Sequence, residues 1–239
     1  NCVTAIHPAQ DGWLWVGTDH CGLYHLSPDG QKSTHYEPSS TPHMPGTVTS
    51  IYQDERGMLW LGSSLGQLVC MDPSTGVCTP IGQIVPGGAG LRKIYGIDAD
   101  RRGNIWLATM GDGLFGYNPR SGLLQHYSTA GAMNQSDRNG ILSSLWNNCV
   151  LVDGSLLFVG HTAGIDCFRI KDDDTLELEG RYLQTAVSDM KMDDYGRVWA
   201  GTGDGLFCLK PEGNGVETTQ LTHKDGLCND VVRSIEIRN

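Results

Sequence analysis

The sequence contains no run of 18 apolar residues, so no part of it is long enough to cross a bilayer as a helix. Positive charge is scarce, because 17 Lys and Arg residues are outnumbered by 27 Asp and Glu residues. The resulting net charge of −10 excludes the basic surface of a nucleic-acid-binding protein. A hydrophobic content of 39% excludes a disordered acidic tail. What is abundant is glycine, at 32 of 239 residues, together with six tryptophans, a composition that indicates short strands joined by tight turns.

Motifs of catalysis and metal binding are missing as well. The sequence has no Cys-x-x-Cys pair, no His-Glu-x-x-His and no Gly-x-Ser-x-Gly, so neither a zinc ribbon, a zinc protease nor that type of hydrolase is expected, and no cofactor is expected. The eight cysteines are interpreted as small buried apolar residues. A disulfide between Cys70 and Cys78, which flank one turn, is left open. The acidic run 172–174 is interpreted as a solvated turn rather than a calcium site.

Five segments of the chain repeat one pattern: a polar turn ending in glycine, one further residue, an apolar residue, an aromatic anchor, an apolar residue, a small residue and then a hydroxyl residue. The aromatic anchors lie 41 to 52 residues apart, at Trp15, Trp60, Trp106, Phe158 and Trp199. The fourth repeat departs from the pattern, with Phe158 in place of Trp and His161 in place of Thr or Ser. One structural unit of about 46 residues therefore recurs along nearly the whole chain.

Each unit is expected to contain four strands. In the second unit these are residues 48–53, 58–62, 67–71 and 77–81, separated by turn-forming residues. Four short antiparallel strands at a period of 40–50 residues predict an all-β fold, a β-propeller of four-stranded antiparallel blades. The expected blades are 1–38, 39–82, 83–130, 131–183 and 184–226, followed by the first strand of a further blade at 227–239.

That last strand is predicted from Val232–Ile235, which matches Val48–Ile51. Because a blade cannot bury its faces alone, we expect the natural protein to continue past Asn239. The alternative is a five-bladed ring with an unpaired strand.

Most repeated residues are predicted to be scaffold. The aromatic anchor is expected to fill the space between neighbouring sheets, and the glycine after the polar turn to adopt a positive φ. The glycine after the anchor is expected to admit a neighbouring backbone. The following Thr or Ser is expected to bond to the next turn.

The segments 51–63, 97–109 and 190–202 resemble the two-component regulator propeller repeat, and 223–232 is similar to that family's blade linker. The resemblance implies the periplasmic sensor region of a hybrid two-component histidine kinase from gut Bacteroidetes, built from seven-bladed propellers. Its implied ligand is an oligosaccharide. The membrane helix and kinase domain implied for the parent protein are absent from this chain, so the segment itself is not expected to be an enzyme. A homodimer of the parent is left open.

A ligand is expected on the face that carries the segments joining successive blades, because these are the long irregular ones: 37–46, 79–91 and 128–140. Candidate contact residues on this face are Asp19, His20, Arg92, Tyr95, Asp112, Arg138, Trp146, His161 and Asp204. The aromatic rings suit the flat face of a sugar and the arginines suit its hydroxyls. The competing interpretation is that each is a solvated loop residue or part of the packing between blades.

Three functions are compared. A ligand-sensing segment of a receptor kinase is the first. A propeller enzyme of the lyase or lactonase type is the second, and the mainly small or apolar residues of the first strands argue against it. The third is a platform for protein interaction.

Overall fold

This computed structural model describes residues 2–81, 92–129, 140–212 and 215–237. Its strands form five four-stranded sheets, and in each sheet neighbouring strands follow one another along the chain. This is the strand order of propeller blades, so the prediction of an all-β propeller fold is confirmed. The chain divides into two compact units, residues 1–125 and 126–239, which are described separately. Within the described residues, no helix is long and apolar enough to cross a membrane.

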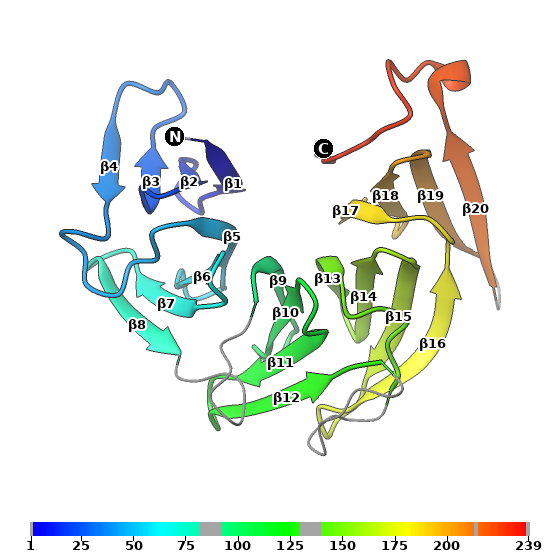
Figure 1. Ribbon diagram of the computed structural model, residues 1–239, viewed down its shortest axis with the longest axis horizontal. Helices are drawn as coiled ribbons and strands as arrows, with labels where there is room; N and C mark the ends of the chain where they lie inside the picture. The colour runs from blue at the N-terminus through cyan, green and yellow to red at the C-terminus, as the bar shows by residue number, and fades with distance from the viewer. Residues whose placement is uncertain (1, 82–91, 130–139, 213–214, 238–239) are drawn as a thin grey trace. The chain divides into compact units, whose positions relative to one another are not determined.

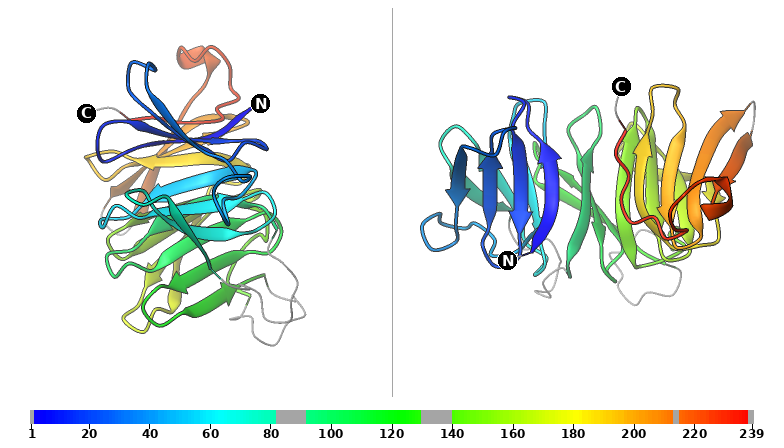
Figure 2. Two further views of the ribbon diagram at one scale, coloured as in Figure 1. Left: turned by 90° about the vertical axis from the view of Figure 1, so that its left-hand side faces the viewer. Right: turned by 90° about the horizontal axis from the view of Figure 1, so that it is seen from above.

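The first unit contains three blades, whose sheets stack face to face (Figures 1 and 2). Blade one consists of β1 (Val3–Pro8), β2 (Leu14–Thr18), β3 (Leu23–Leu26) and β4 (Ser33–Tyr36). Blade two consists of β5 (Val48–Gln53), β6 (Leu59–Ser63), β7 (Leu68–Asp72) and β8 (Val77–Ile81). Blade three consists of β9 (Ile94–Ala99), β10 (Ile105–Thr109), β11 (Leu114–Asn118) and β12 (Leu123–Tyr127), whose last residues cross the boundary between the units.

The second unit contains two blades and a short 3-10 helix. Blade four consists of β13 (Asn147–Asp153), β14 (Leu156–His161), β15 (Gly164–Ile170) and β16 (Leu176–Tyr182). Blade five consists of β17 (Val187–Met192), β18 (Val198–Thr202), β19 (Gly205–Glu212) and β20 (Gly215–Leu221), and the 3-10 helix spans His223–Asp225. The strands expected for blade two agree with β5–β8 to within one residue at each end.

The hydrophobic core of each unit lies between neighbouring sheets. Trp15 is 1% exposed and packs with Val48 and Leu59 of the next blade. Trp60 packs in the same way with Ile94 and Ile105 of blade three. In the second unit, Phe158 belongs to the corresponding cluster between blades four and five. The role predicted for the aromatic anchors is therefore confirmed in these blades.

An aspartate holds the aromatic anchor in place, a contact that the sequence reasoning missed. The indole N–H donates to a carboxylate in three blades: Trp60 to Asp54 at 3.2 Å, Trp106 to Asp100 at 3.4 Å and Trp199 to Asp193 at 2.9 Å. In blade four Phe158 has no N–H to satisfy. Blade one has Ala9 at the aspartate position, and Trp15 Nε1 is buried with no hydrogen-bond partner in the described part of the chain.

The two glycine roles expected from the repeat are also confirmed. Gly57, after the polar turn of blade two, has φ +81°. Gly62, after the anchor, faces the next blade so closely that an added Cβ would lie 2.8 Å from Ile94 Cγ2. An added Cβ at Gly17 would lie 2.8 Å from the carbonyl oxygen of Val48. Neighbouring blades therefore approach each other at these glycines.

All eight cysteines are free thiols. Cys78 lies opposite Met71 in the β7–β8 ladder, while Cys70 lies opposite Thr79. Because successive residues of a strand point to opposite faces, Cys70 and Cys78 face away from each other, and the disulfide left open by the sequence does not form. Cys70, Cys167 and Cys208 do occupy one repeat position, each opposite the aromatic anchor of its blade.

The C-terminal segment predicted as the first strand of a further blade runs beside blade five without strand pairing. An added Cβ at Gly201 would lie 2.9 Å from the Val232 carbonyl oxygen, much as Gly17 meets Val48. Val232 N also donates to the Thr202 carbonyl at 2.8 Å. The segment thus packs against blade five at the position of a first strand, but residues 227–237 form no strand.

Candidate functional site

One face of the blades carries both the joining segments and the turns after the second strands, as expected. In blade two Ser64 N donates to the Thr47 carbonyl at 3.4 Å, and in blade four Thr162 N donates to the Trp146 carbonyl at 3.2 Å. Each bond links a turn to the segment just before the first strand of the same blade. We call this face the joining-loop face, and the opposite face the tight-turn face.

In the first unit the candidate residues form separate small groups. Asp19 accepts a hydrogen bond from the Thr47 hydroxyl at 2.9 Å, and the exposed His20 donates its backbone N–H to the same hydroxyl at 3.2 Å. His20 has φ +65°, so this turn holds a non-glycine residue in the left-handed region. These bonds connect the turn of blade one to the joining segment of blade two.

A second group in the first unit lies in blade three. Arg92 N donates to Asp112 Oδ2 at 2.6 Å, and Arg92 Nε lies 3.8 Å from Asp112 Oδ1. Lys93 Nζ lies 4.3 Å from the centre of the Tyr95 ring. Arg92 and Asp112 therefore form an ion pair with each other, and Tyr95 is engaged by a neighbouring cation.

In the second unit the candidates are Trp146, His161 and Asp204. Asp204 accepts a hydrogen bond from the Thr185 hydroxyl, which links a turn of blade five to its joining segment. Trp146 is 45% exposed, whereas His161 is 1% exposed. The ninth candidate, Arg138, lies outside the described residues.

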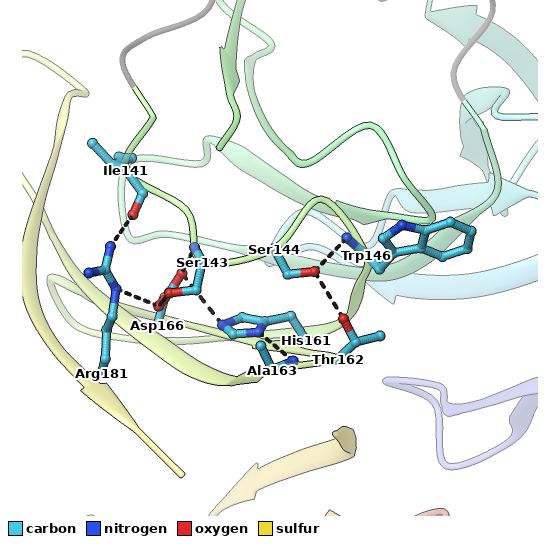
Figure 3. Close-up of polar contacts among 9 residues, drawn as sticks. All are labelled: Ile141, Ser143, Ser144, Trp146, His161, Thr162, Ala163, Asp166 and Arg181. Carbon is cyan, nitrogen blue, oxygen red and sulfur yellow. Dashed lines mark hydrogen bonds and ion pairs between the residues drawn. The ribbon is translucent and has the colours of Figure 1, made fainter. Parts of the chain in front are cut away.

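His161 belongs to a group that we call the blade-four polar cluster, made of Ser143, Asn147, His161, Asp166 and Arg181. Most of its members are shown with their contacts in Figure 3. Asp166 is fully buried and accepts hydrogen bonds from Ser143 N and Ser143 Oγ, both at 2.6 Å. Arg181 Nε lies 3.3 Å from Asp166 Oδ1, and Arg181 Nη2 donates to the Ile141 carbonyl at 3.1 Å. The joining segment is therefore fastened to β15 and β16.

Three members of the cluster are unusual for their positions in the repeat. Asn147 pairs with His161 in the β13–β14 ladder at the position where the other blades have Val or Ile opposite Thr or Ser. Asp166 pairs in the β14–β15 ladder with Val159, the residue after the anchor, and at this ladder position the other blades have Tyr, Val or Phe. All three are at most 1% exposed. Blade four thus replaces apolar or hydroxyl residues with a buried polar group.

Burial disfavours the charged form of Asp166, but the hydrogen bonds from His161 and Ser143 outweigh it and lower the pKa of this carboxyl below its ordinary value. Asp166 is therefore ionised at neutral pH. Its charge faces His161 Nε2 at 3.5 Å and the half-exposed Arg181.

The order of these groups is not that of a catalytic triad. In a triad the histidine lies between the serine and the carboxylate, so that it can take the serine proton. Here Ser143 Oγ donates directly to Asp166, and His161 Nδ1 accepts a hydrogen bond from Ala163 N at 3.1 Å. Ser143 is therefore not activated as a nucleophile, and His161, the last residue of β14, accepts a hydrogen bond from the turn that follows.

Two buried side-chain atoms of the cluster, Asn147 Nδ2 and Asn147 Oδ1, have no hydrogen-bond partner among the described residues, whereas His161 Nε2 faces Asp166 Oδ2 at 3.5 Å. Buried polar groups are nearly always paired with protein or water, so an unpaired buried amide is exceptional. The part of the chain that the structure describes contains no group of three or more His, Cys, Asp or Glu residues placed to hold a metal ion.

Sequence reasoning selected His161 and Trp146 but missed Ser143, Asn147, Asp166 and Arg181. The signal for two of these was present in the repeat. A position-by-position comparison of the five units would have marked Asn147 and Asp166 as polar residues at buried positions. Ser143 and Arg181 carry no such signal, since a joining segment and a fourth strand both tolerate polar residues.

Residues 44–64, which run from before β5 to just past β6, match the family model for the two component regulator propeller. The resemblance found in the sequence is thereby confirmed for this repeat. A comparison of the sequence with curated proteins finds no match.

Solved structures share the fold at low sequence identity. The extracellular domain of BT4673 from B. thetaiotaomicron, assigned to a one component system, has a TM-score of 0.74 at 18% identity over 98% of this chain and 30% of that chain. A second structure of it, assigned to a hybrid two component system, has a TM-score of 0.65 at 17% identity over 98% and 35%.

PorZ, a surface component of the type-IX secretion system of Porphyromonas gingivalis, has a TM-score of 0.73 at 17% identity over 98% of this chain and 36% of that chain. A protein assigned to the gluconolactonases has a TM-score of 0.68 at 16% identity over 97% and 80%. The chain thus spans about a third of the length of BT4673 and PorZ. At these identities the likeness concerns the fold: the chain has the β-propeller architecture and carries a two-component regulator propeller repeat at residues 44–64.

Proposed function

We propose that this chain is the ligand-sensing segment of a two-component receptor, placed outside the cytoplasm in the periplasm, and that it binds an oligosaccharide on the joining-loop face of blade four. The repeat at residues 44–64 supports the receptor class. The extracellular domains that share the fold support the location. Both statements go beyond what a common fold establishes, so experiments must test them.

The observation that carries the choice of blade four is the placement of Trp146. Its backbone N–H donates to Ser144 Oγ at 3.0 Å, and its carbonyl accepts from Thr162 N at 3.2 Å. The Ser144 and Thr162 hydroxyls lie 3.0 Å apart (Figure 3). The backbone is therefore fixed on both sides while the indole stays 45% exposed. A rigidly mounted aromatic plate suits the apolar face of a sugar ring at low entropic cost.

Signalling requires that the ligand prefer one arrangement of the receptor over another. The blade-four polar cluster fastens the segment before Trp146 to β15 and β16 through Asp166 and Arg181. A sugar bound on Trp146 would therefore act on a segment that is tied into the blade. The proposal assigns ligand binding, and no catalytic step, to this chain.

The test is a thermal-shift screen of the purified chain against neutral oligosaccharides, each with and without EDTA. We expect one glycan to raise the melting temperature by mass action, with no effect of EDTA. Trp146→Ala should abolish that shift. Tyr195→Ala is the matched control, since Tyr195 is an exposed aromatic residue on the tight-turn face. Equal loss of binding in both variants would refute the assignment to blade four.

The enzyme alternative is tested by a lactone-hydrolysis assay of the same purified chain, with and without EDTA. A lactonase of this fold would hydrolyse a lactone and lose that activity with EDTA if it used a metal. The Ser143–Asp166–His161 order argues against serine-based hydrolysis, as described above. An interaction platform would leave the melting temperature unchanged with every glycan and bind a protein partner instead.

A further inference from the structure

Two equivalent grooves lie on the tight-turn face of the first unit. The blade 1–2 groove has a volume of about 310 Å³ and is lined by Ala9, Gln10, Asp11, Trp15, His25, Gln53, Pro73 and Ser74. The blade 2–3 groove has a volume of about 360 Å³, and its lining includes Asp54, Glu55, Arg56, Asp100, Arg101 and Arg120. In both, the first turn of one blade meets the prolyl turn between the third and fourth strands of the next. Their volumes are at the lower end of the range for small-molecule sites.

The two grooves differ sharply in charge. Where the blade 1–2 groove has Asp11 and Ser74, the blade 2–3 groove has Arg56 and Arg120 at the equivalent positions. Four of the eleven arginines of a chain with net charge −10 line this one groove. The same scaffold therefore presents one groove lined by a single carboxylate, Asp11, and one groove lined by four arginines.

The carboxylates of the blade 2–3 groove are largely occupied. Asp54 accepts from Arg56 N, Met58 N and the Trp60 indole, and also pairs with Arg56 Nη2 at 3.2 Å. Asp100 is 7% exposed and accepts from Arg102 N, Asn104 N and Asn104 Nδ2. The carboxylates of Asp54 and Asp100 are thus hydrogen-bonded within their own turns. The exposed Glu55 is therefore the acid whose charge would repel an anion in the groove.

Two of the arginines are available to a ligand. The guanidinium groups of Arg101 and Arg120 are exposed, and neither makes a hydrogen bond or ion pair with the described residues. The planar guanidinium fork matches carboxylate, sulfate and phosphate oxygens, often through two parallel hydrogen bonds. Both residues line the same groove, so an anion in the groove has two guanidinium forks available to it.

We propose that the blade 2–3 groove is a second binding site, which takes a small molecule carrying an oxyanion, through Arg101 and Arg120. The site lies on the face opposite the joining-loop face and is independent of Trp146. Its ligand differs in charge from the neutral oligosaccharides expected there. The shared chemistry is the oxyanion, whether it comes from a carboxylate, a sulfate or a phosphate.

The test is isothermal titration of the purified chain, at constant ionic strength, with inorganic sulfate, glucuronate, glucose 6-phosphate and glucose. We expect at least one of the three anions to bind and glucose not to bind at this site. Arg120→Ser copies the residue of the blade 1–2 groove and should weaken binding about tenfold. Glu55→Gln removes the opposing charge and should strengthen it. The anion that binds most tightly identifies the source of the oxyanion.

The matched control is Arg169→Gln, which removes one positive charge from the second unit, where Arg169 pairs with Glu179. It should leave anion binding unchanged. The proposal is overturned if no anion binds, or if Arg169→Gln weakens binding as much as Arg120→Ser. Neither result would bear on Trp146, so this proposal and the proposed function can fail separately.

Discussion

The substitution Ala9→Asp should stabilise this protein. Ala9 stands at the position where blades two, three and five have an aspartate that accepts the indole N–H of the aromatic anchor. Trp15 Nε1 is consequently buried without a hydrogen-bond partner in the described part of the chain. The blade 1–2 groove, of about 310 Å³, borders Ala9 and offers room for the larger side chain.

The expected gain follows from the cost of the unpaired donor. A buried N–H without a partner costs about 1–3 kcal/mol, and a hydrogen bond to a charged group contributes about 1.5–3 kcal/mol. Part of this gain in stability is lost because the carboxylate introduced at position 9 must be desolvated close to Asp11, whose Oδ1 already accepts from Trp13 N at 3.0 Å. We therefore expect a net gain of about 1 kcal/mol, or a rise of about 2–4 °C in melting temperature for a chain of this size.

The measurement is urea unfolding of the wild type, Ala9→Asp, Trp15→Phe and the double variant. Phenylalanine keeps most of the ring but has no N–H, so the gain from Ala9→Asp should vanish in the Trp15→Phe background. Asp54→Ala is the reciprocal variant in blade two and should cost about 3 kcal/mol, since it leaves the Trp60 indole and two backbone N–H groups unpaired. A gain of equal size with and without the indole N–H would refute the reasoning.

Three further predictions follow from single residues. The hydrogen bonds that Asp193 accepts outweigh the effect of burial and lower its pKa to about 2. The ionised carboxylate therefore stabilises the folded protein fully above the ordinary pKa of about 4, and this stabilisation is lost as the pH falls towards 2. Asp193→Asn should flatten this part of the pH profile of the unfolding free energy, measured by urea unfolding. Gly62→Ala should cost about 1–3 kcal/mol, because its Cβ would lie 2.8 Å from Ile94 Cγ2, and thermal unfolding would measure the loss; an unchanged melting temperature would contradict this close approach. The exposed Cys2 should react rapidly with a thiol reagent, whereas burial raises the pKa of the Cys149 thiol and should delay its reaction until the protein unfolds; equal rates for both would be incompatible with this core.

The architecture was predictable because it is repeated. A period of about 46 residues, carried by Trp15, Trp60, Trp106 and their equivalents, is a local pattern that survives five copies. Each copy contains its own turn glycine and its own close-approach glycine, so the strands of blade two could be placed to within one residue. The disulfide that does not form shows the limit. Cys70 pairs with Thr79, one residue away from Cys78, and this offset depends on the register of the ladder, which the turn sequence alone did not specify.

The sequence by itself determined the number of blades in this chain, the strand order within each blade and the roles of the aromatic anchors and glycines, since these depend on periodicity and local backbone preference. Tertiary structure alone decided which side chains meet. Ser143, Asp166 and Arg181 come from a joining segment and two different strands, and no spacing in the chain announces their contact. The two grooves of the tight-turn face likewise combine turns from neighbouring blades. Such sites arise from the packing of one blade against the next, which brings together residues that lie tens of positions apart.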